Sequence, residues 1–382
     1  MDMTNDRKTG AGMSRRRLMK SALSAGIVLA APAIVGRAMV SSARAAFEGE
    51  GLIVVSWSGN FELNFRSSVV EPFNARYGTK VETMGGWDQM VSQIVAAPAD
   101  NPPFDITIAD EYTTSTGLAE NIFLETDRSK IPGFEAVFPW FDAERGDAKK
   151  YGVPFGAGSL WMLTSKASGV APDSWANFWG EKALGKTTMD AAAFYWDLCI
   201  PALLSDAKPG IDEVFQSPAD MEPLFVELEK LRMAKWYKDG AELSNLMLQE
   251  EAQVAMMYSA DAYGFIKDHG DDFSAAIPKE GTASYMNWLI KVRGTRHSEL
   301  ADLFLAYLLE KDTQQRFLDS STDFMSRMDI TPPAHWAGYP RSDEEAGKVF
   351  KLFSIDGWAK FGPNWDALDA RMKKTIAVTT QG

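Results

Sequence analysis

Residues 52–60 read Leu-Ile-Val-Val-Ser-Trp-Ser-Gly-Asn, an apolar run that ends in a Ser-Gly-Asn turn. A short run rich in Val and Ile and bounded by turn residues is typical of a strand buried on both faces of a parallel sheet. Two similar stretches follow, at 80–83 and 104–109. The first is expected to end in the loop Gly85-Gly86-Trp87, and the second in Asp110-Glu111-Tyr112.

The segments between these strands have helical spacing. A stripe of residues recurs every four positions, namely Phe61, Phe65, Val69, Phe73 and Tyr77. Pro72 is expected to kink or split this helix, because proline lacks the N–H that an internal helical hydrogen bond requires. Gly78 suits the position just after the helix, and Met90, Ile94 and Val95 indicate another helix.

The alternation of strand and helix continues along the chain. We expect further strands at 187–189, 253–258 and 289–292, extended crossing segments at 151–155 and 273–278, and helices at 174–179, through Phe194 and Leu198, at 224–231 and at 298–307. Strands that alternate with helices predict an α/β fold in which a parallel sheet is covered by helices.

The N-terminus reads as an export signal. Residues 14–20 are Ser-Arg-Arg-Arg-Leu-Met-Lys, followed by an apolar stretch at 22–35 and by Ala43-Arg44-Ala45. Twin arginines before a short apolar run indicate the twin-arginine export route, and the A-x-A triplet indicates cleavage before Ala46. The run is too short for a membrane span, which needs about 20 apolar residues, and Pro32 and Gly36 weaken it as a helix. The alternative is a chance basic N-terminus on a cytoplasmic protein.

Composition excludes several classes of function. The whole chain has 39 basic and 52 acidic side chains, of which residues 1–45 hold eight and two. The remaining 337 residues therefore have 31 basic and 50 acidic side chains, a net charge of −19. Such a surface repels nucleic acid and anionic membranes. Cys199 is the only cysteine, and the three histidines, His269, His297 and His335, lack metal-site spacing. We therefore expect neither a disulfide, nor a zinc site, nor a cofactor.

Two glycine motifs are interpreted as structural. Residues 180–187 match the G-x4-G-K-[ST] pattern of a phosphate-binding loop, but the flanking order is inverted, with a predicted helix before it and a strand after it. Gly156-Ala-Gly158 lacks the third glycine of a dinucleotide fingerprint and is interpreted as a tight turn near a hinge. Catalytic motifs have little support in this chain.

Aromatic and acidic residues gather where the predicted strands end. Ligands of open parallel sheets bind outside the carboxyl ends of the strands. Aromatic rings offer faces to alkyl chains and cations, and carboxylates pair with ammonium groups. The candidate binding residues are Trp57, Ser58, Trp87, Asp110, Glu111, Tyr112, Asp190, Tyr258, Asp261 and Asn287.

Several segments together resemble the substrate-binding proteins of ABC importers, in the branch that includes spermidine/putrescine-binding proteins. They are Val54-Val55-Ser56-Trp57-Ser58-Gly59, Glu71-Pro72-Phe73 with Tyr77-Gly78, Pro103-Phe104-Asp105-Ile106, Tyr151-Gly152-Val153-Pro154-Phe155, Ser174-Trp175-Ala176-Asn177-Phe178-Trp179 with Gly185-Lys186, and Val254-Ala255-Met256-Met257-Tyr258. Each is weak alone, but their order and spacing are fairly specific.

The resemblance implies a two-lobed α/β fold of the periplasmic-binding-protein type (type II-like), with the ligand clamped between the lobes. Lobe 1 would comprise 46–152 and 279–330, lobe 2 would comprise 153–278, and a helical tail at 331–382 would pack on them. The protein would be a periplasmic monomer that delivers its solute to a membrane permease, and closure around the ligand would be the signal.

The polyamine pocket implied by the resemblance is incomplete. Trp57, Tyr112 and Asp190 stand at matching positions, and Tyr258 replaces a usual tryptophan. Ala193 and Asn287, however, fall where a polyamine binder tends to have carboxylates. A polyvalent cation would be left poorly paired there. We therefore expect a smaller amine, a zwitterion or a quaternary ammonium compound. The alternatives are an exported enzyme acting on a small polar substrate and a chemosensory protein that presents a ligand to a membrane receptor.

Overall fold

The computed structural model describes residues 32–87, 89–205, 212, 215 and 217–380. The chain falls into two compact units, Met1–Ala46 and Phe47–Gly382. The described part of the first unit, residues 32–46, belongs to helix α2 (Pro32–Phe47). Pro32 and Gly36, which we expected to weaken a helix in the apolar stretch at 22–35, both lie within this described helix.

The predicted cleavage triplet Ala43-Arg44-Ala45 lies within α2. The twin-arginine motif at 14–20 and most of the apolar stretch at 22–35 lie outside the described residues. Among the helices that are described, none has the length and apolar character needed to cross a membrane.

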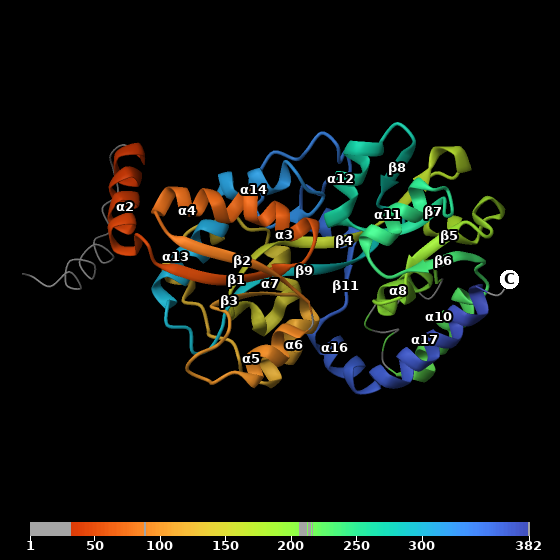
Figure 1. Cartoon of the computed structure of the whole chain (residues 1–382), viewed down its shortest axis with the longest axis horizontal. Coiled ribbons are helices and arrows are strands. Elements are labelled where there is room, and N and C mark those ends of the chain that lie inside the picture. The colour runs from red at the N-terminus through yellow and green to blue at the C-terminus, as the bar shows by residue number, and fades with distance from the viewer. Residues whose placement is uncertain (1–31, 88, 206–211, 213–214, 216, 381–382) are drawn as a thin grey trace, which may run out of the picture. The chain divides into compact units, whose positions relative to one another are not determined.

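A mixed sheet is the centre of the second unit (Figure 1). Its strand order is β2-β1-β3-β9-β4-β7-β5-β6, with β8 and β10 also paired to β4 and β11 paired to β9. The strands are β1 (Gly51–Trp57), β2 (Lys80–Gly86), β3 (Ile106–Ala109), β4 (Val153–Ser165), β5 (Thr187–Asp190), β6 (Met233–Tyr237), β7 (Val254–Tyr258), β8 (Phe273–Ala276), β9 (Thr282–Lys291), β10 (Phe324–Met325) and β11 (Phe350–Leu352).

Strand β4 joins two sets of strands. Its residues from Val153 to Ser159 pair with β9, whereas Leu160 to Thr164 pair with β7. The first set therefore contains β2, β1, β3 and β9, and the second contains β7, β5 and β6. Strands β2, β1 and β3 are parallel to one another, as are β7, β5 and β6. Strand β9, which contains the strand predicted at 289–292, is antiparallel to both β3 and β4, contrary to the prediction of a parallel sheet. The sheet is thus mixed, and not parallel throughout.

The crossing segments differ in detail from the prediction. The expected extended segment at 151–155 is the start of β4, which continues for 13 residues. The segment at 273–278 contains β8, which pairs with the second half of β4 and does not cross to the first set. Instead β9 runs beside the first half of β4. It is longer than the strand predicted at 289–292.

The stripe after β1 forms a helix in three parts. These are α3 (Asn60–Phe65), a π-helical turn (Arg66–Val70) and α4 (Glu71–Tyr77). The π turn directly precedes Pro72, whose ring and missing N–H disfavour regular bonding to the preceding turn. An α-helix has 3.6 residues per turn, so side chains spaced four apart gradually leave one face of it. The π turn contains more residues per turn and so keeps the stripe from Phe61 to Tyr77 on one face. All five stripe residues are buried, and Gly78 ends the helix at φ 70° as predicted.

Glycines allow close packing in strands that were predicted as loops or turns. Strand β2 continues through Gly85 and Gly86. A Cβ added at Gly85 would lie 2.6 Å from Oγ of Ser58, and a Cβ added at Gly86 would lie 2.6 Å from Cγ1 of Val55. Gly156 and Gly158 lie within β4, so the predicted turn there is wrong. A Cβ at Gly158 would lie 2.3 Å from the ring of Tyr285.

The glycine-lysine segment before β5 is no phosphate loop. Residues Trp175–Trp179 and Glu181–Ala183 form 3-10 turns, and Ser174 caps the first of them through the N–H of Ala176. Strand β5 follows this segment directly. The helix-then-strand order predicted from the sequence is therefore confirmed, and no helix begins at the Lys-Thr pair to direct its N–H groups at a phosphate.

The remaining helices cover the sheet and its edges (Figure 1). They are α5 (Gln89–Ala96), α6 (Glu111–Ala119), α7 (Pro139–Arg145), α8 (Phe194–Leu204), α10 (Pro218–Leu228), α11 (Gly240–Leu248), α12 (Ser259–His269), α13 (Ser298–Leu308), α14 (Lys311–Leu318), α15 (Asp343–Val349), α16 (Ile355–Phe361) and α17 (Trp365–Thr380), with short 3-10 turns at Arg128–Lys130, Phe134–Ala136, Gly146–Lys150, Lys166–Ser168 and Gly362–Asn364.

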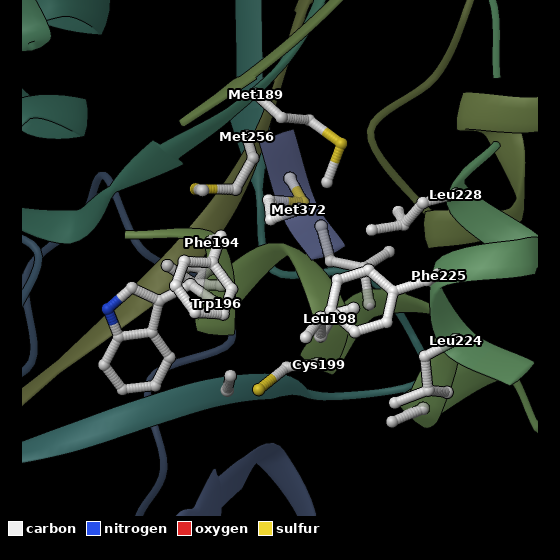
Figure 2. Close-up of a cluster of buried hydrophobic side chains, with 14 of the residues drawn as sticks. Met189, Phe194, Trp196, Leu198, Cys199, Leu224, Phe225, Leu228, Met256 and Met372 are labelled. Atoms are coloured by element: carbon white, nitrogen blue, oxygen red, sulfur yellow. The ribbon is translucent and has the colours of Figure 1, made fainter. Parts of the chain in front are cut away.

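One large hydrophobic cluster lies around α8 (Figure 2). Phe194 and Leu198 of α8 meet Phe225 of α10, Met256 of β7 and Met372 of α17 there. Cys199 is buried in the same cluster, and burial raises the pKa of its thiol. Because α16 and α17 add Trp358, Phe361 and Leu368 to this cluster, the C-terminal segment is part of the core.

Candidate functional site

The carboxyl end of β1 places Trp57 beside two other predicted residues. The indole Nε1 of Trp57 donates to Oδ1 of Asn287 on β9 at 2.7 Å. The ring of Trp87, which follows β2, stacks on Trp57 with centroids 6.2 Å apart. Trp57 is buried and Trp87 is 54% exposed. Ser58 lies next to Gly85 of β2. Trp57, Ser58, Trp87 and Asn287 are therefore brought together at one end of the first strand set.

The three residues after β3 point in different directions. Asp110 caps α6 and accepts from the N–H of Thr113 at 2.8 Å. The carboxyl of Glu111 accepts from the backbone N–H of Met286 at 3.2 Å. The ring of Tyr112 packs against Trp358 of α16, with centroids 5.2 Å apart. Glu111 and Tyr112 thus contact β9 and the C-terminal segment, and neither lies in the group around Trp57.

Burial and one arginine set the charge near Glu111. Burial raises the pKa of Glu111 to about 8, and the nearby charge of Arg145 opposes this. Burial lowers the pKa of Arg145 to about 10, although the charges of Glu111 and Asp110 act to raise it. Burial also raises the pKa of Asp110, and its hydrogen bonds to Thr113 oppose the rise. Glu111 and Arg145 thus influence each other in a buried region, where Arg145 of α7 donates to Thr114 of α6 and Glu111 of α6 accepts from the Met286 N–H of β9.

The second strand set brings Asp190 and Tyr258 into direct contact. The hydroxyl of Tyr258 donates to Oδ2 of Asp190 at 2.8 Å, and the backbone N–H of Ala192 donates to Oδ1 at 2.7 Å. Burial raises the pKa of Asp190, while these hydrogen bonds lower it. A carboxyl that ends a strand and keeps a raised pKa favours a cationic partner, which would stabilise its ionised form.

The two strand sets meet where β1 and β7 end. Asn60 opens α3, directly after β1, and Asp261 lies in the first turn of α12, directly after β7. The side-chain Nδ2 of Asn60 donates to Oδ1 of Asp261 at 2.8 Å. Burial raises the pKa of Asp261, and the bond from Asn60 lowers it. The ends of β1 and β7 are therefore joined here, and we call the region around Asn60 and Asp261 the strand-end junction.

Four further residues at or near this junction were not predicted as ligand-binding: Asn60, Tyr285, Asp323 and Asp197. Tyr285 lies on β9 between the sets, with its ring 5.7 Å from that of Trp196 and its pKa raised by burial and by the charges of Asp323 and Asp261. Strand alternation could have identified it, because residues i and i+2 share a face and Asn287 was already a candidate. Asn60 belongs to the turn that ends the first predicted strand.

Asp323 and Asp197 carry no comparable signal in the sequence. Asp323 precedes β10, which is antiparallel to β4, so the rule about parallel strand ends does not apply. Asp197 lies inside α8 and is fully buried. Neither carboxyl oxygen of Asp197 has a hydrogen-bond partner among the described residues, and burial followed by the charge of Asp190 raises its pKa well above the usual range.

Two surface pockets lie away from the junction. One, of about 260 Å³, is beside Phe138, Arg327 and Tyr339, and the other, of about 460 Å³, is beside Lys235, Glu242 and Leu246. Neither is lined by a predicted ligand-binding residue. In the part of the chain that the structure describes, no three His, Cys, Asp or Glu side chains are grouped so that they could hold a metal ion.

Comparison with known proteins identifies the fold. The sequence model of the family described as bacterial extracellular solute-binding protein matches residues 68–340. No curated protein matches the chain. Among solved structures, a spermidine/putrescine ABC transporter substrate-binding protein from Streptococcus pneumoniae is 16% identical with a TM-score of 0.69, and the match covers 87% of this chain and 99% of that one.

Two further solved structures show the same similarity. An ABC transporter from Clostridium perfringens is 20% identical with a TM-score of 0.61, covering 85% of this chain and 99% of that chain. The protein MotA of A. tumefaciens B6, in complex with glucopine, is 16% identical with a TM-score of 0.65, again covering 85% and 99%. At these identities the likeness establishes the fold, which is that of periplasmic binding proteins, as the sequence predicted.

Proposed function

The chain belongs to the bacterial extracellular solute-binding proteins, and from that premise we propose that it captures a small amine or zwitterion at the strand-end junction and delivers it to an ABC importer. The observation that carries the proposal is the hydrogen bond from Asn60 to Asp261. It supports a closing surface between a first lobe of residues 46–152 and 279–330 and a second lobe of 153–278. A solute bound there would contact both lobes and so favour their closed arrangement.

The charges at the junction favour a cationic group. Asp110, Asp190 and Asp261 all have raised pKa values, and burial is the largest cause in each case. Hydrogen bonds compensate each carboxylate only in part. A bound ammonium group would replace the lost hydration and lower these pKa values. The rings of Trp57, Trp87 and Tyr285 add apolar and π surface for the rest of the solute.

The same residues argue against a polyamine. Asn287 uses its side-chain oxygen to hold Trp57, and Ala193 offers only its backbone N–H, to Asp190. A second ammonium group would find no carboxylate at either position. Ligands named for similar structures include spermidine/putrescine and GABA. They support the amine class, and the missing carboxylates favour its members with one positive charge.

Calorimetric titration of the purified protein with putrescine, spermidine, 4-aminobutyrate and glycine betaine tests this function. We expect at least one singly charged compound to bind with a micromolar or lower Kd and more tightly than spermidine. The compound should be recovered unchanged, whereas an enzyme would transform it. Failure of all four to bind would overturn the amine class, and tighter binding of spermidine would overturn the argument from Ala193 and Asn287.

We also propose that the protein works in the periplasm as a monomer after export by the twin-arginine route. The motif at 14–20, the apolar stretch after it and the Ala43-Arg44-Ala45 triplet support this. Replacing Arg15, Arg16 and Arg17 by lysine should keep the protein in the cytoplasm in cell fractions. Periplasmic accumulation of that variant would contradict the route. Light scattering of the mature protein would reveal any dimer.

A further inference from the structure

Asp323 is a buried carboxylate that joins the two strand sets. It directly precedes β10, which pairs with the first half of β4, and it is only 2% exposed. Its Oδ1 accepts a hydrogen bond from the hydroxyl of Ser259, the first residue of α12. Ser259 is held in turn, because its Oγ accepts from the N–H of Ser159 at 3.1 Å and its carbonyl accepts from Thr322.

The second carboxyl oxygen of Asp323, Oδ2, has no hydrogen-bond partner within the described residues. The Ser259 hydroxyl is committed to Oδ1 and cannot also serve Oδ2. At Asp190, by contrast, both carboxyl oxygens accept hydrogen bonds, one from the N–H of Ala192 and one from the hydroxyl of Tyr258. A buried carboxylate oxygen without a donor is costly, which indicates that a donor from outside the chain belongs there.

The groups that face Asp323 come from several elements. Ser259 and Asp261 lie on α12, Tyr285 lies on β9, and Tyr339 follows β10. The influences on its carboxyl are burial, the Ser259 hydroxyl and the charge of Asp261, and they do not include a basic side chain. Together they raise the pKa of Asp323 to about 7. Within the described chain, the charged group that acts on the Asp323 carboxyl is thus acidic, and no countercharge offsets it.

We propose that Asp323 binds the cationic group of the solute through its free oxygen, as a specificity-determining residue near the strand-end junction. This rests on the proposed function and adds to it one carboxylate for the single ammonium group of the solute. When the solute binds, an Asp323 that carries a proton releases it to the buffer, and the ammonium group keeps its own protons. Capture of the solute is thereby coupled to proton release near neutral pH.

The sign of the pH effect follows from this competition. A proton and a cationic solute exclude each other at the same carboxylate. Affinity therefore rises with pH and levels off above the pKa of the free protein, which is about 7. If Asp323 alone titrated, the Kd would fall about tenfold between pH 6 and pH 8, and about half a proton would be released per solute at pH 7.

The test compares Asp323→Asn with the wild-type mature protein by calorimetry at pH 6 and pH 8, using whichever of putrescine, spermidine, 4-aminobutyrate and glycine betaine binds the wild type most tightly. Titration in phosphate and in Tris, which differ in ionisation enthalpy, measures the protons released. We expect D323N to bind about ten- to a hundredfold more weakly at pH 8, and to lose the component of proton release that Asp323 contributes. Asp319→Asn, an exposed change on the same segment, should match the wild type.

The outcomes separate this proposal from the general function. If the wild type binds one of the amines and D323N matches it in affinity and in proton release, the role of Asp323 is overturned and the amine function stands. If none of the four compounds binds the wild type, the amine function fails and this proposal fails with it. Because Asn keeps the acceptor for Ser259, D323N should fold, and thermal unfolding with circular dichroism will check this. Should it not fold, Asp323→Ser provides the same comparison with a smaller side chain.

Discussion

The side chain of Asn287 is fixed by Trp57, whose indole N–H donates to its oxygen over 2.7 Å. Both residues are buried. This bond joins the end of β1 to the middle of β9, on which Tyr285 also lies. Position 287 is therefore held in one orientation at the strand-end junction, so a change of its charge should alter solute preference with little change in geometry.

Restoring a carboxylate at this position tests the charge argument. In Asn287→Asp, one oxygen should still accept from Trp57, and the new negative charge should favour a second ammonium group. We expect the affinity for putrescine to rise about tenfold relative to that for 4-aminobutyrate, as a charge-assisted hydrogen bond would provide. Calorimetry measures both affinities. Asn101→Asp adds the same charge at an exposed position and should leave the ratio unchanged; an unchanged ratio in N287D would exclude position 287 from solute selection.

Removing the hydrogen bond between Asn60 and Asp261 should favour opening of the lobes. In Asn60→Ala the carboxyl of Asp261 loses its donor, and the contact loses about 1 kcal/mol. We expect a larger radius of gyration by small-angle scattering without solute, and a several-fold weaker solute affinity. Asn177→Ala removes bonds made within the second lobe, to Ala171 and Asp173, and should change neither. Equal scattering curves for N60A and the wild type would show that this bond does not hold the lobes together.

The buried Glu111 should make the fold less stable as pH rises. Its pKa in the folded protein is about 8, against an ordinary value of 4.5, so the folded state binds more protons than the unfolded state between those values. The free energy of unfolding should then fall across this interval, by at most about 1.4 kcal/mol per pH unit for this one group. The component due to Glu111 is fully present below pH 4.5 and lost as the pH passes about 8.

Urea unfolding from pH 5 to pH 8.5 measures this effect. In Glu111→Gln the slope should become shallower, because the neutral amide cannot ionise, although one acceptor of the Met286 N–H remains. The exposed Glu120→Gln is the control on the same helix and should keep the wild-type slope. A wild-type slope in E111Q would show that Glu111 is ionised throughout the range.

Trp87 should contribute to binding and little to stability. Its ring is 54% exposed but stacks on Trp57, so it lies where a cationic solute would meet the junction. In Trp87→Ala we expect a loss of about 0.5–2 kcal/mol in binding energy, the range for a cation–π contact, and a nearly unchanged melting temperature. Leu63→Ala truncates another exposed apolar side chain, 65% accessible, on α3. If L63A weakened binding as much as W87A, the effect would not be specific to the tryptophan.

The C-terminal segment should be necessary for the fold. Trp358 of α16 is 4% exposed and packs against Tyr112 of α6 and Tyr195 of α8. It therefore connects helices that follow β3 and β5. Replacing it by alanine should lower the free energy of unfolding by about 3–5 kcal/mol. Val378→Ala, at a 47% exposed position of α17, should cost little. A small loss in W358A would mean that α16 can leave the core without much effect.

Local patterns predicted several of the strands and helices, but not strands β6, β10 and β11 or helices such as α6, α7, α11 and α12. The apolar run at 52–57 became β1, and the stripe from Phe61 to Tyr77 became one interrupted helix. These predictions succeeded because burial on a sheet or on one helix face imposes a period that the sequence must show. The glycines of β2 and β4 were wrongly predicted to form a loop and a turn. Glycine occurs in turns, but it also occurs in strands where another side chain approaches the backbone closely.

The sequence alone determined that this chain alternates strands and helices, that aromatic and acidic residues follow the strand ends, and that it resembles the solute-binding proteins. Only the tertiary structure decided which of those residues meet. Hydrogen bonds join Trp57 to Asn287, Asp190 to Tyr258, and Asp261 to Asn60. Glu111 instead accepts from the Met286 N–H, and the ring of Tyr112 packs against Trp358. The spacing of residues along a strand or helix determines the face on which each residue lies, and this can be read from the sequence. Which faces of the two strand sets come together depends on the path of β4, which pairs with β9 in the first set and with β7 in the second.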